Sequence, residues 1–346
     1  MTSTSTPTSI AGLTRRRLGL GVMAVAATAA APFGSARAET FAVRMTGHHR
    51  GLLRGEAFAI PTYHLNFVTS QQATSVASIG ARTRLALVMV GPDQASMRKL
   101  TNDAYADLRT QMQAANLALI SPEETRAMVR AAGLAEVPGN VEIAGIGGGV
   151  TIGSSLRRGW ATFGPDAAPA LTPVMSMRGA GGGGFAAMGA IAAISALAPL
   201  NRQPGLANKV ALAPSLVLDF ARLDARRPGM FGGGAASVGG NIAFGLLATS
   251  KVTAQKPAGR GMGTPGAFNP REDVFSATPF ASVVEGGAAV NAGPSFSNTV
   301  DDSYQAVQRA RGDAVMIDVP VWEGLVRDAY RGYNAGIVEA VRSMQA

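Results

Sequence analysis

The sequence predicts an α/β or α+β fold, in which a small strand-helix-strand layer is extended by a long antiparallel β hairpin section and packed by a C-terminal helix. Three stretches predict this fold. Residues 83–133 alternate strand and helix signals, residues 209–255 hold two long β segments around a glycine-rich bend, and residues 321–344 carry a helical apolar pattern. The chain has 346 residues and 47% hydrophobic content, which is enough to bury a core.

The strand-helix-strand layer is the best supported of these elements. Leu85–Val90 is a run of apolar and β-branched residues that is typical of a buried strand. Asp93 offers an N-cap to the helix that follows, in which apolar residues recur at three- and four-residue steps. Leu117–Ile120 is predicted as a second short strand. Two strands joined by a helix indicate a parallel crossover.

A second helix follows this layer. Ser121-Pro122-Glu123-Glu124 is a capping box with proline at the first helical position. Gly133 is placed to end that helix. The short range between them, residues 122–132, is therefore predicted to be helical.

The chain before this layer is less regular. Phe41–Met45 and Ala57–Val68 are predicted strands, and Pro61 predicts a bulge or an edge in the second. The polar stretch Ser70–Ser78 is predicted as a connector that leads into the strand at Leu85.

The middle of the chain changes composition after Gly133. Residues 134–184 are rich in glycine and proline and lack a clear period, so they are predicted to be irregular with one short strand. Phe185–Leu197 is predicted as an alanine-rich buried helix, because it has no polar face.

A β section and a final helix complete the predicted fold. Lys209–Leu223 and Ala236–Gln255 form the predicted hairpin, residues 256–272 a mobile loop, and Thr278–Val290 a third strand. Ala314–Val319 is a short predicted strand. The helix Val321–Met344 is expected to pack on the sheet that contains Leu85–Val90, with Asp318 capping its start.

The first 38 residues have the features of a twin-arginine signal peptide. Arg15 and Arg16 fit the Ser/Thr-Arg-Arg-x-hydrophobic pattern, a weakly apolar run follows, and Ala36 and Ala38 form a small-x-small cleavage site. The apolar run is shorter than the roughly 20 residues that span a bilayer, which disfavours a membrane anchor. We expect export to the periplasm or the cell exterior, and a single mature domain over residues 39–346.

Charge and cysteine content exclude several function classes. Four of the 31 basic residues lie in residues 1–38, so the mature chain has 27 basic and 22 acidic residues, a net charge of +5. This small, dispersed excess does not predict nucleic-acid binding. The chain has no cysteine, which excludes disulfides, thiolate nucleophiles and cysteine metal sites.

One glycine motif is a candidate cofactor-binding site. Gly179, Gly181 and Gly184 fit the dinucleotide fingerprint and precede a predicted helix, whose N-terminus would suit a phosphate. The fingerprint also needs an acidic residue about 20 positions further on, and none lies between Asp166 and Asp219. A glycine-rich chain matches such a pattern by composition, so the sequence predicts no cofactor.

Histidines and carboxylates form no recognisable catalytic or metal-binding pattern. His48, His49 and His64 have neither helical i, i+4 spacing nor a known ligand motif, and a solvated loop explains the pair better than a metal does. No Gly-x-Ser-x-Gly elbow occurs. An enzyme would be indicated by a closed pocket that converges on His64, Asp219 or the loop 179–184.

The order of elements resembles that of the envelope proteins related to the curli-secretion channel and the TolB amino-terminal domain. The resemblance lies in the signal segment, the layer at 85–120, the alanine-rich helix, the hairpin at 209–255 and the C-terminal helix. It implies an anticodon-binding-like α/β layer and a role as an envelope assembly factor. A twin-arginine signal replaces the lipoprotein cysteine of that group, and no functional residues carry over.

Two function classes remain at this stage. The first is an exported, non-enzymatic envelope protein that binds a partner or helps to assemble a surface structure, because exposed β edges recruit strands. Its partner would be another envelope protein or another copy of itself. The second is an exported enzyme or cofactor-binding protein that uses the loop 179–184. The sequence favours the first, and it favours a plain antiparallel sheet over membrane contact for residues 209–290.

Overall fold

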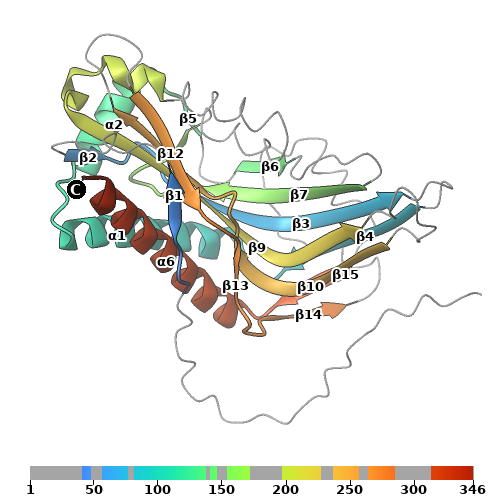
Figure 1. The fold of residues 1–346 in the computed structure, drawn as a ribbon. Coiled ribbons are helices and arrows are strands. Elements are labelled where there is room, and N and C mark those ends of the chain that lie inside the picture. The colour runs from blue at the N-terminus through green and yellow to red at the C-terminus, as the bar shows by residue number, and fades with distance from the viewer. Residues whose placement is uncertain are drawn as a thin grey trace, which may run out of the picture. The chain divides into compact units, whose positions relative to one another are not determined.

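The structure is a computed structural model that confirms the mixed α/β fold. The two longest helices cover one face of a mixed sheet, and the long strands of the sheet extend past them (Figure 1). Contacts group residues 38–346 into one compact unit. The structure describes these residues: 41–47, 57–76, 82–137, 141–145, 154–171, 197–226, 237–256, 264–284 and 313–345.

Thirteen strands of the described chain belong to the main sheet. The continuous path through it runs β1-β12-β11-β9-β3-β4-β15-β14, and the remaining strands branch from β3, β7, β9 and β10. The strand bounds are β1 Met45–Gly47, β2 Ala57–Ala59, β3 His64–Val76, β4 Arg82–Val90, β6 Val141–Gly145, β7 Ser154–Phe163, β9 Lys209–Arg226, β10 Ser237–Leu246, β11 Lys251–Lys256, β12 Thr264–Pro270, β13 Val274–Phe275, β14 Ala281–Val284 and β15 Asp313–Ile317. β5 (Glu136–Val137) and β8 (Ala170–Leu171) pair separately.

The central strand β9 confirms the predicted hairpin. Leu218 to Arg226 of this 18-residue strand pair antiparallel with β10, and the predicted bend between the two strands lies outside the described residues. The predicted segment 236–255 is divided into β10 and β11 by a turn, in which the hydroxyl of Ser250 accepts a hydrogen bond from Val217 N at 2.9 Å. Both pieces pair with the same strand, β9. The turn therefore interrupts the ladder without ending it.

Strand β3 corrects the prediction of a polar connector at 70–78. β3 runs on through Ser70, Gln71, Gln72 and Thr74, all of which are buried, as far as Val76. Both edges of this part are paired, with β4 on one side and β7 on the other. Polar composition misled the prediction because β3 is an interior strand whose polar side chains are buried on the faces of the sheet instead of facing water.

Two further predictions were wrong for a related reason. The stretch 134–184, predicted to be irregular, contains the ten-residue strand β7, which is paired with β3 and β6. The predicted mobile loop at 256–272 contains β12, which is paired with β11 and β1. Glycine and proline disfavour strands locally, but pairing on both edges stabilises these strands through contacts distant in sequence. Most of the predicted helix at 185–197 lies outside the described residues.

Helices α1 (Gln94–Ala114) and α2 (Pro122–Ala131) begin where the sequence predicts. The carboxylate of Asp93 accepts a hydrogen bond from Ser96 N at 2.7 Å, and the hydroxyl of Ser121 accepts one from Glu124 N at 3.1 Å. Gly133 follows α2 with a φ of 69°, the left-handed conformation that ends helices. These local signals were sufficient because capping depends on neighbouring residues alone.

The short strand predicted at 117–120 does not lie beside Leu85–Val90, as a parallel crossover would place it, but beside β2. Phe58 N of β2 donates to Ala118 O at 2.8 Å, and Ile120 N donates to Phe58 O at 2.9 Å. Residues 117–120 therefore extend a parallel contact with β2, whereas β4 pairs with β3 and β15.

The C-terminal helix α6 (Val319–Gln345) packs on the sheet, as predicted. Asp318 caps it through a 3.3 Å bond from Val321 N, and its aromatic residues enter the main core, where the Trp322 ring lies 5.5 Å from that of Phe67. Helix α1 lies beside α6 (Figure 1). The 3₁₀ turns Ala198–Arg202 and Pro204–Leu206 cover a second, smaller core together with α2.

An extended segment, Phe41–Arg44, lies directly against the backbone of α6, and we call it the strap. Two glycines make this approach possible. A Cβ at Gly332 would overlap the carbonyl oxygen of Phe41, and one at Gly336 would lie 2.7 Å from that of Val43. The ring of Phe41 is buried edge-on against Phe244 with centroids 6.0 Å apart.

We expect Gly332→Ala to destabilise the protein by about 2 kcal/mol, because the added methyl group must push the strap away from the helix. Gly324→Ala on the same helix is the matched control, since a Cβ there meets nothing within 4 Å. That change should stabilise the protein by up to about 1 kcal/mol through helix propensity. Urea unfolding measures both, and equal effects of the two substitutions would contradict the close packing of the strap.

Candidate functional site

Several residues singled out from the sequence lie outside the described residues. They comprise the candidate loop glycines Gly179, Gly181 and Gly184, and the signal residues Arg15, Arg16, Ala36 and Ala38. His48 and His49 lie outside as well. The two predicted positions that the structure does place are His64 and Asp219.

His64 is fully buried at the start of β3. Its Nε2 accepts a hydrogen bond from Leu171 N of β8 at 3.2 Å. The ring thus joins the main sheet to the two-stranded β5–β8 sheet. This contact gives His64 a structural function in the interior of the protein.

Asp219 lies where the main sheet divides. Strands β3 and β9 pair in parallel over residues 64–67 and 215–218, and beyond this point β4 takes the place of β9 beside β3. Asp219 is the first residue of β9 past the paired region. We call this position the sheet fork.

Three side chains meet at the sheet fork. Arg158 Nε of β7 lies 2.9 Å from Asp219 Oδ2, and the Gln71 amide of β3 donates to Asp219 Oδ1. The same amide donates to Ala221 O at 2.7 Å, and Phe220 N donates to Asp219 Oδ1 at 2.9 Å. Gln71 therefore bridges the gap between two strands that have ceased to pair.

Burial dominates the electrostatics of this cluster. The side chain of Asp219 has no exposed area, and that of Arg158 is 18% exposed. Desolvation raises the pKa of Asp219 above its ordinary value, and the positive charge of Arg158 partly offsets that rise. Among the described residues, Gln71 Oε1 and the hydroxyl of Ser70 are buried without a hydrogen-bond partner. The cluster fixes the relative positions of β3, β7 and β9.

Sequence reasoning did not find Arg158 or Gln71. Arg158 falls in the stretch predicted to be irregular, and Gln71 in the stretch predicted as a connector. The available signal was Asp219 itself, the one carboxylate in the largely apolar stretch Lys209–Leu223, because a buried charge requires a partner.

A second buried network joins both long helices to the sheet. Tyr63 Oη donates to Asn334 Oδ1 at 3.1 Å, and Asn334 Nδ2 donates to Ala104 O at 2.9 Å and to Asp107 Oδ2 at 2.8 Å. Burial raises the pKa of Tyr63 well above its ordinary value, so the phenol is held in its neutral form. The network orients α1 and α6 at the surface that they share.

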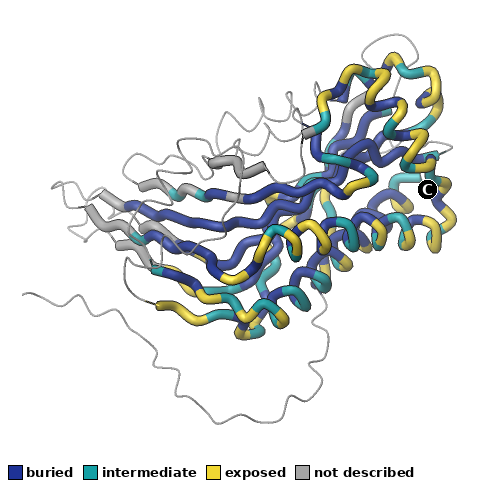
Figure 2. The backbone as a smooth tube through the Cα atoms, turned by 180° about the vertical axis from the view of Figure 1, so that it is seen from behind, coloured by how far each residue is buried: buried dark blue, intermediate teal, exposed yellow. Residues whose placement is uncertain are grey.

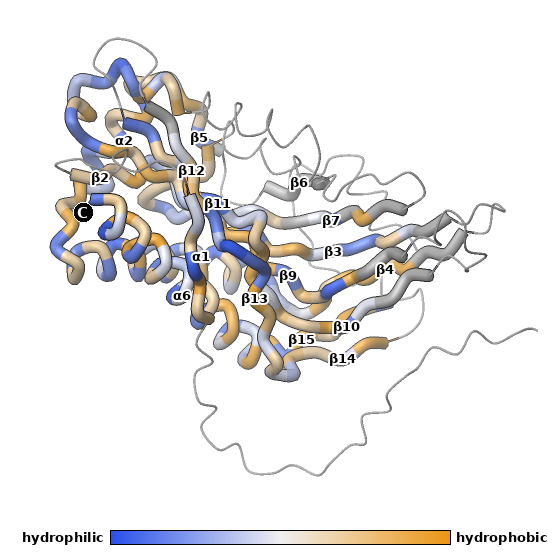
Figure 3. Tube along the Cα trace, in the orientation of Figure 1, coloured by the Kyte–Doolittle hydropathy of each residue, from blue (hydrophilic) through white to orange (hydrophobic). Residues whose placement is uncertain are grey.

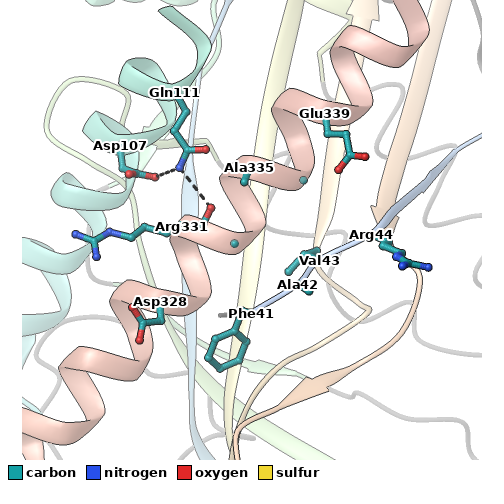
Figure 4. A pocket seen from close by; sticks show the side chains of 12 residues that line it. Phe41, Ala42, Val43, Arg44, Asp107, Gln111, Asp328, Arg331, Ala335 and Glu339 are labelled. Atoms are coloured by element: carbon teal, nitrogen blue, oxygen red, sulfur yellow. Dashed lines mark hydrogen bonds between the residues drawn. The ribbon is translucent and has the colours of Figure 1, made fainter. Parts of the chain in front are cut away.

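Two grooves open along α6. The first, the strap groove, has a volume of about 590 Å³ and lies between the strap, α6 and α1 (Figure 4). The second, the α1 groove, has a volume of about 700 Å³ and lies between the C-terminal parts of α1 and α6. Both share Gln111, Ala335 and Glu339. Neither includes His64 or Asp219, so these two grooves do not form the converging pocket that would indicate an enzyme.

The edge of the sheet at β14 exposes apolar side chains. Within the described chain, the exposed large hydrophobic residues are Val283, Val284 and Met316, with 45%, 48% and 40% of their surfaces accessible. They lie on β14 and its neighbour β15. This edge of the sheet is exposed (Figure 2) and also hydrophobic (Figure 3). β14 pairs with β15 and with no other described strand.

Metal-binding clusters and membrane-spanning helices are absent from the described residues. No group of three or more histidine, aspartate or glutamate side chains in the described ranges is arranged to hold a metal ion. Of the helices that the structure describes, none has the length and apolarity to cross a membrane. Comparison of the chain with protein-family models, curated proteins and solved structures finds no match.

We expect Arg158→Ala to cost about 3–5 kcal/mol near pH 7, because it leaves the buried carboxylate of Asp219 without its counter-ion. The folded protein binds the proton of Asp219 more tightly than the unfolded chain does, since its pKa is raised. The stability lost in Arg158→Ala should therefore shrink as the pH falls through the pKa of Asp219 in the folded protein, because protonation of Asp219 removes the buried charge. Urea unfolding at several pH values measures this.

Arg98→Ala is the matched control for this prediction. Arg98 pairs with Asp166 at the surface, with 60% and 61% of the two side chains exposed, so its loss should cost at most about 1 kcal/mol. If Arg158→Ala lost as little stability as Arg98→Ala, or lost more stability as the pH fell, the burial of the Asp219 carboxylate against Arg158 would be contradicted.

Proposed function

We propose that this chain is an exported, non-enzymatic envelope protein that binds a partner protein through β14, the edge of the sheet that the structure describes. The observation that carries the proposal is the grouping of the exposed apolar residues Val283, Val284 and Met316 at that edge. Strand addition uses the unpaired backbone groups of an edge for affinity, and alternate side chains for specificity.

The composition of β14 supports this proposal. Edge strands of monomeric proteins are commonly protected by lysine, proline, a bulge or an inward-pointing charge. β14, with the sequence Ala281-Ser282-Val283-Val284, has none of these residues, and its pairing with β15 is regular. A strand of this composition and pairing is suited to receive another strand at its edge.

Export is the second part of the proposal, and it rests on the twin-arginine pattern at Arg15 and Arg16 and the cleavage pattern at Ala36 and Ala38. The resemblance to envelope assembly factors points to the same compartment. The alternative, an exported cofactor-binding protein, would need a cavity that includes Gly179, Gly181 or Gly184, which lie outside the described residues.

We expect the double substitution Arg15→Lys and Arg16→Lys to keep the uncleaved precursor in the cytoplasm, because the pattern requires both arginines. Cell fractionation with an antibody to the mature domain measures this. Arg17→Lys is the control, since Arg17 fills the variable position of the pattern and the mature protein should still be exported. Undiminished export of the double variant would exclude the twin-arginine route.

We expect a photo-crosslinking amino acid at Val284 to form one discrete adduct with another envelope protein in intact cells. Val283→Lys should reduce the yield of that adduct by at least about tenfold, because a charge on an edge strand opposes strand addition. The adduct is measured by electrophoresis and identified by mass spectrometry.

The same crosslinker at Ala127 is the matched control, since Ala127 is exposed on α2, away from the sheet edge. No adduct should form there. Equal labelling at both positions, or an adduct at Val284 that Val283→Lys leaves unchanged, would contradict partner binding at β14.

A further inference from the structure

Helix α6 presents a stripe of alternating charge to solvent. Arg331, Ala335, Glu339 and Arg342 are exposed, and Asp328 lies half-buried at the end of the same row. Steps of three and four residues keep all five on one side of the helix. Figure 4 shows the first four of these positions, from Asp328 to Glu339, in succession along α6. We call this row the α6 stripe.

Hollows flank the α6 stripe. The strap groove and the α1 groove together reach from Asp328 to Ser343 and share Ala335. The surface at the centre is low because the exposed residue Ala335 has a small side chain, while the strap lies against Gly332 and Gly336 beside it. The two grooves leave space for long side chains of another helix to enter beside the stripe.

The charges of the stripe are arranged with opposite signs about Ala335. Arg331 precedes Ala335 by four residues and Glu339 follows it by four, while Asp328 and Arg342 lie seven residues before and after it. Arg331 and Glu339 are about 12 Å apart along the helix at 1.5 Å per residue, so they do not pair with each other. In the described part of the chain, Arg331, Glu339 and Arg342 make no ion pair.

We propose that the α6 stripe binds a second copy of this chain, with the two α6 helices antiparallel about a two-fold axis at Ala335. In that arrangement Arg331 meets Glu339 of the partner subunit, and Glu339 meets Arg331 of the partner subunit. The same axis brings Arg342 to Asp328 of the partner subunit. Each charge then faces one of opposite sign.

The pattern identifies a second copy as the occupant because it is complementary to itself. A two-fold dimer places the same surface on both subunits, so each position at one distance before the axis meets the position at the same distance after it. The residues four positions before and after Ala335 have opposite charges, and so do the residues seven positions before and after it. Every charge of the stripe would therefore meet an opposite charge across the axis. The inference goes beyond the proposed function, since it uses a different surface from β14.

Charge reversal at the stripe tests the dimer. Sedimentation velocity of the purified protein over a range of concentrations should give a monomer–dimer equilibrium that weakens with added salt. Arg331→Glu alone, or Glu339→Arg alone, should raise the dimer Kd by at least about tenfold, because like charges then meet at two places. The double substitution Arg331→Glu with Glu339→Arg should restore the Kd of the natural protein.

A mixture of the two single variants provides the sharpest comparison. One variant then carries acidic side chains at both positions and the other carries basic ones, so they should form a mixed dimer although neither forms its own. Arg202→Glu, a charge reversal at an exposed residue of the 3₁₀ turn Ala198–Arg202, should leave the Kd unchanged.

A disulfide experiment locates the axis independently, since the natural chain has no cysteine. Ala335→Cys should give a disulfide-linked dimer on mild oxidation, because a residue on a two-fold axis lies close to its own copy. Ala127→Cys on α2 should remain monomeric. A natural protein that stays monomeric at every concentration, a Kd insensitive to Arg331→Glu, or equal crosslinking at both cysteine positions would overturn the proposal.

Discussion

The burial of Asp219 against Arg158 and Gln71 is the interaction on which the sheet depends. It links β3 to β9 beyond the point where their hydrogen-bonded ladder ends. The carboxylate belongs to β9 and is bound by side chains of β7 and β3, so one charge cluster ties together three strands far apart in sequence. Hydrogen bonds and ion pairs are directional, so the cluster adds a geometric constraint to the non-directional apolar packing around it.

The sequence predicted those parts of the fold that depend on neighbouring residues. Asp93, Ser121 and Gly133 mark helix ends through contacts within four residues, and all three were confirmed. The periodicity of α6 and the apolar run of β9 were equally local signals. The fold class, the C-terminal helix and the hairpin followed from them.

The parts that failed depend on pairing between distant segments. Gln71 and Arg158 lie opposite each other on β3 and β7, 87 residues apart in the chain, and neither has strand character in its own sequence context. Polar residues buried between paired strands resemble a loop when read alone. For the same reason the sheet fork was not foreseen, although its central residue Asp219 had been noted. The exposed edge at β14 could be recognised only once its neighbours were known.

The strap closes a long loop in the chain. Phe41, in the first described segment, rests on Gly332 of the last described helix. A contact of such high sequence separation adds to the contact order of the protein, and a high contact order slows folding because the entropy of loop closure must be overcome. The glycines that admit the strap therefore bear on the rate of folding as well as on the stability of the folded state.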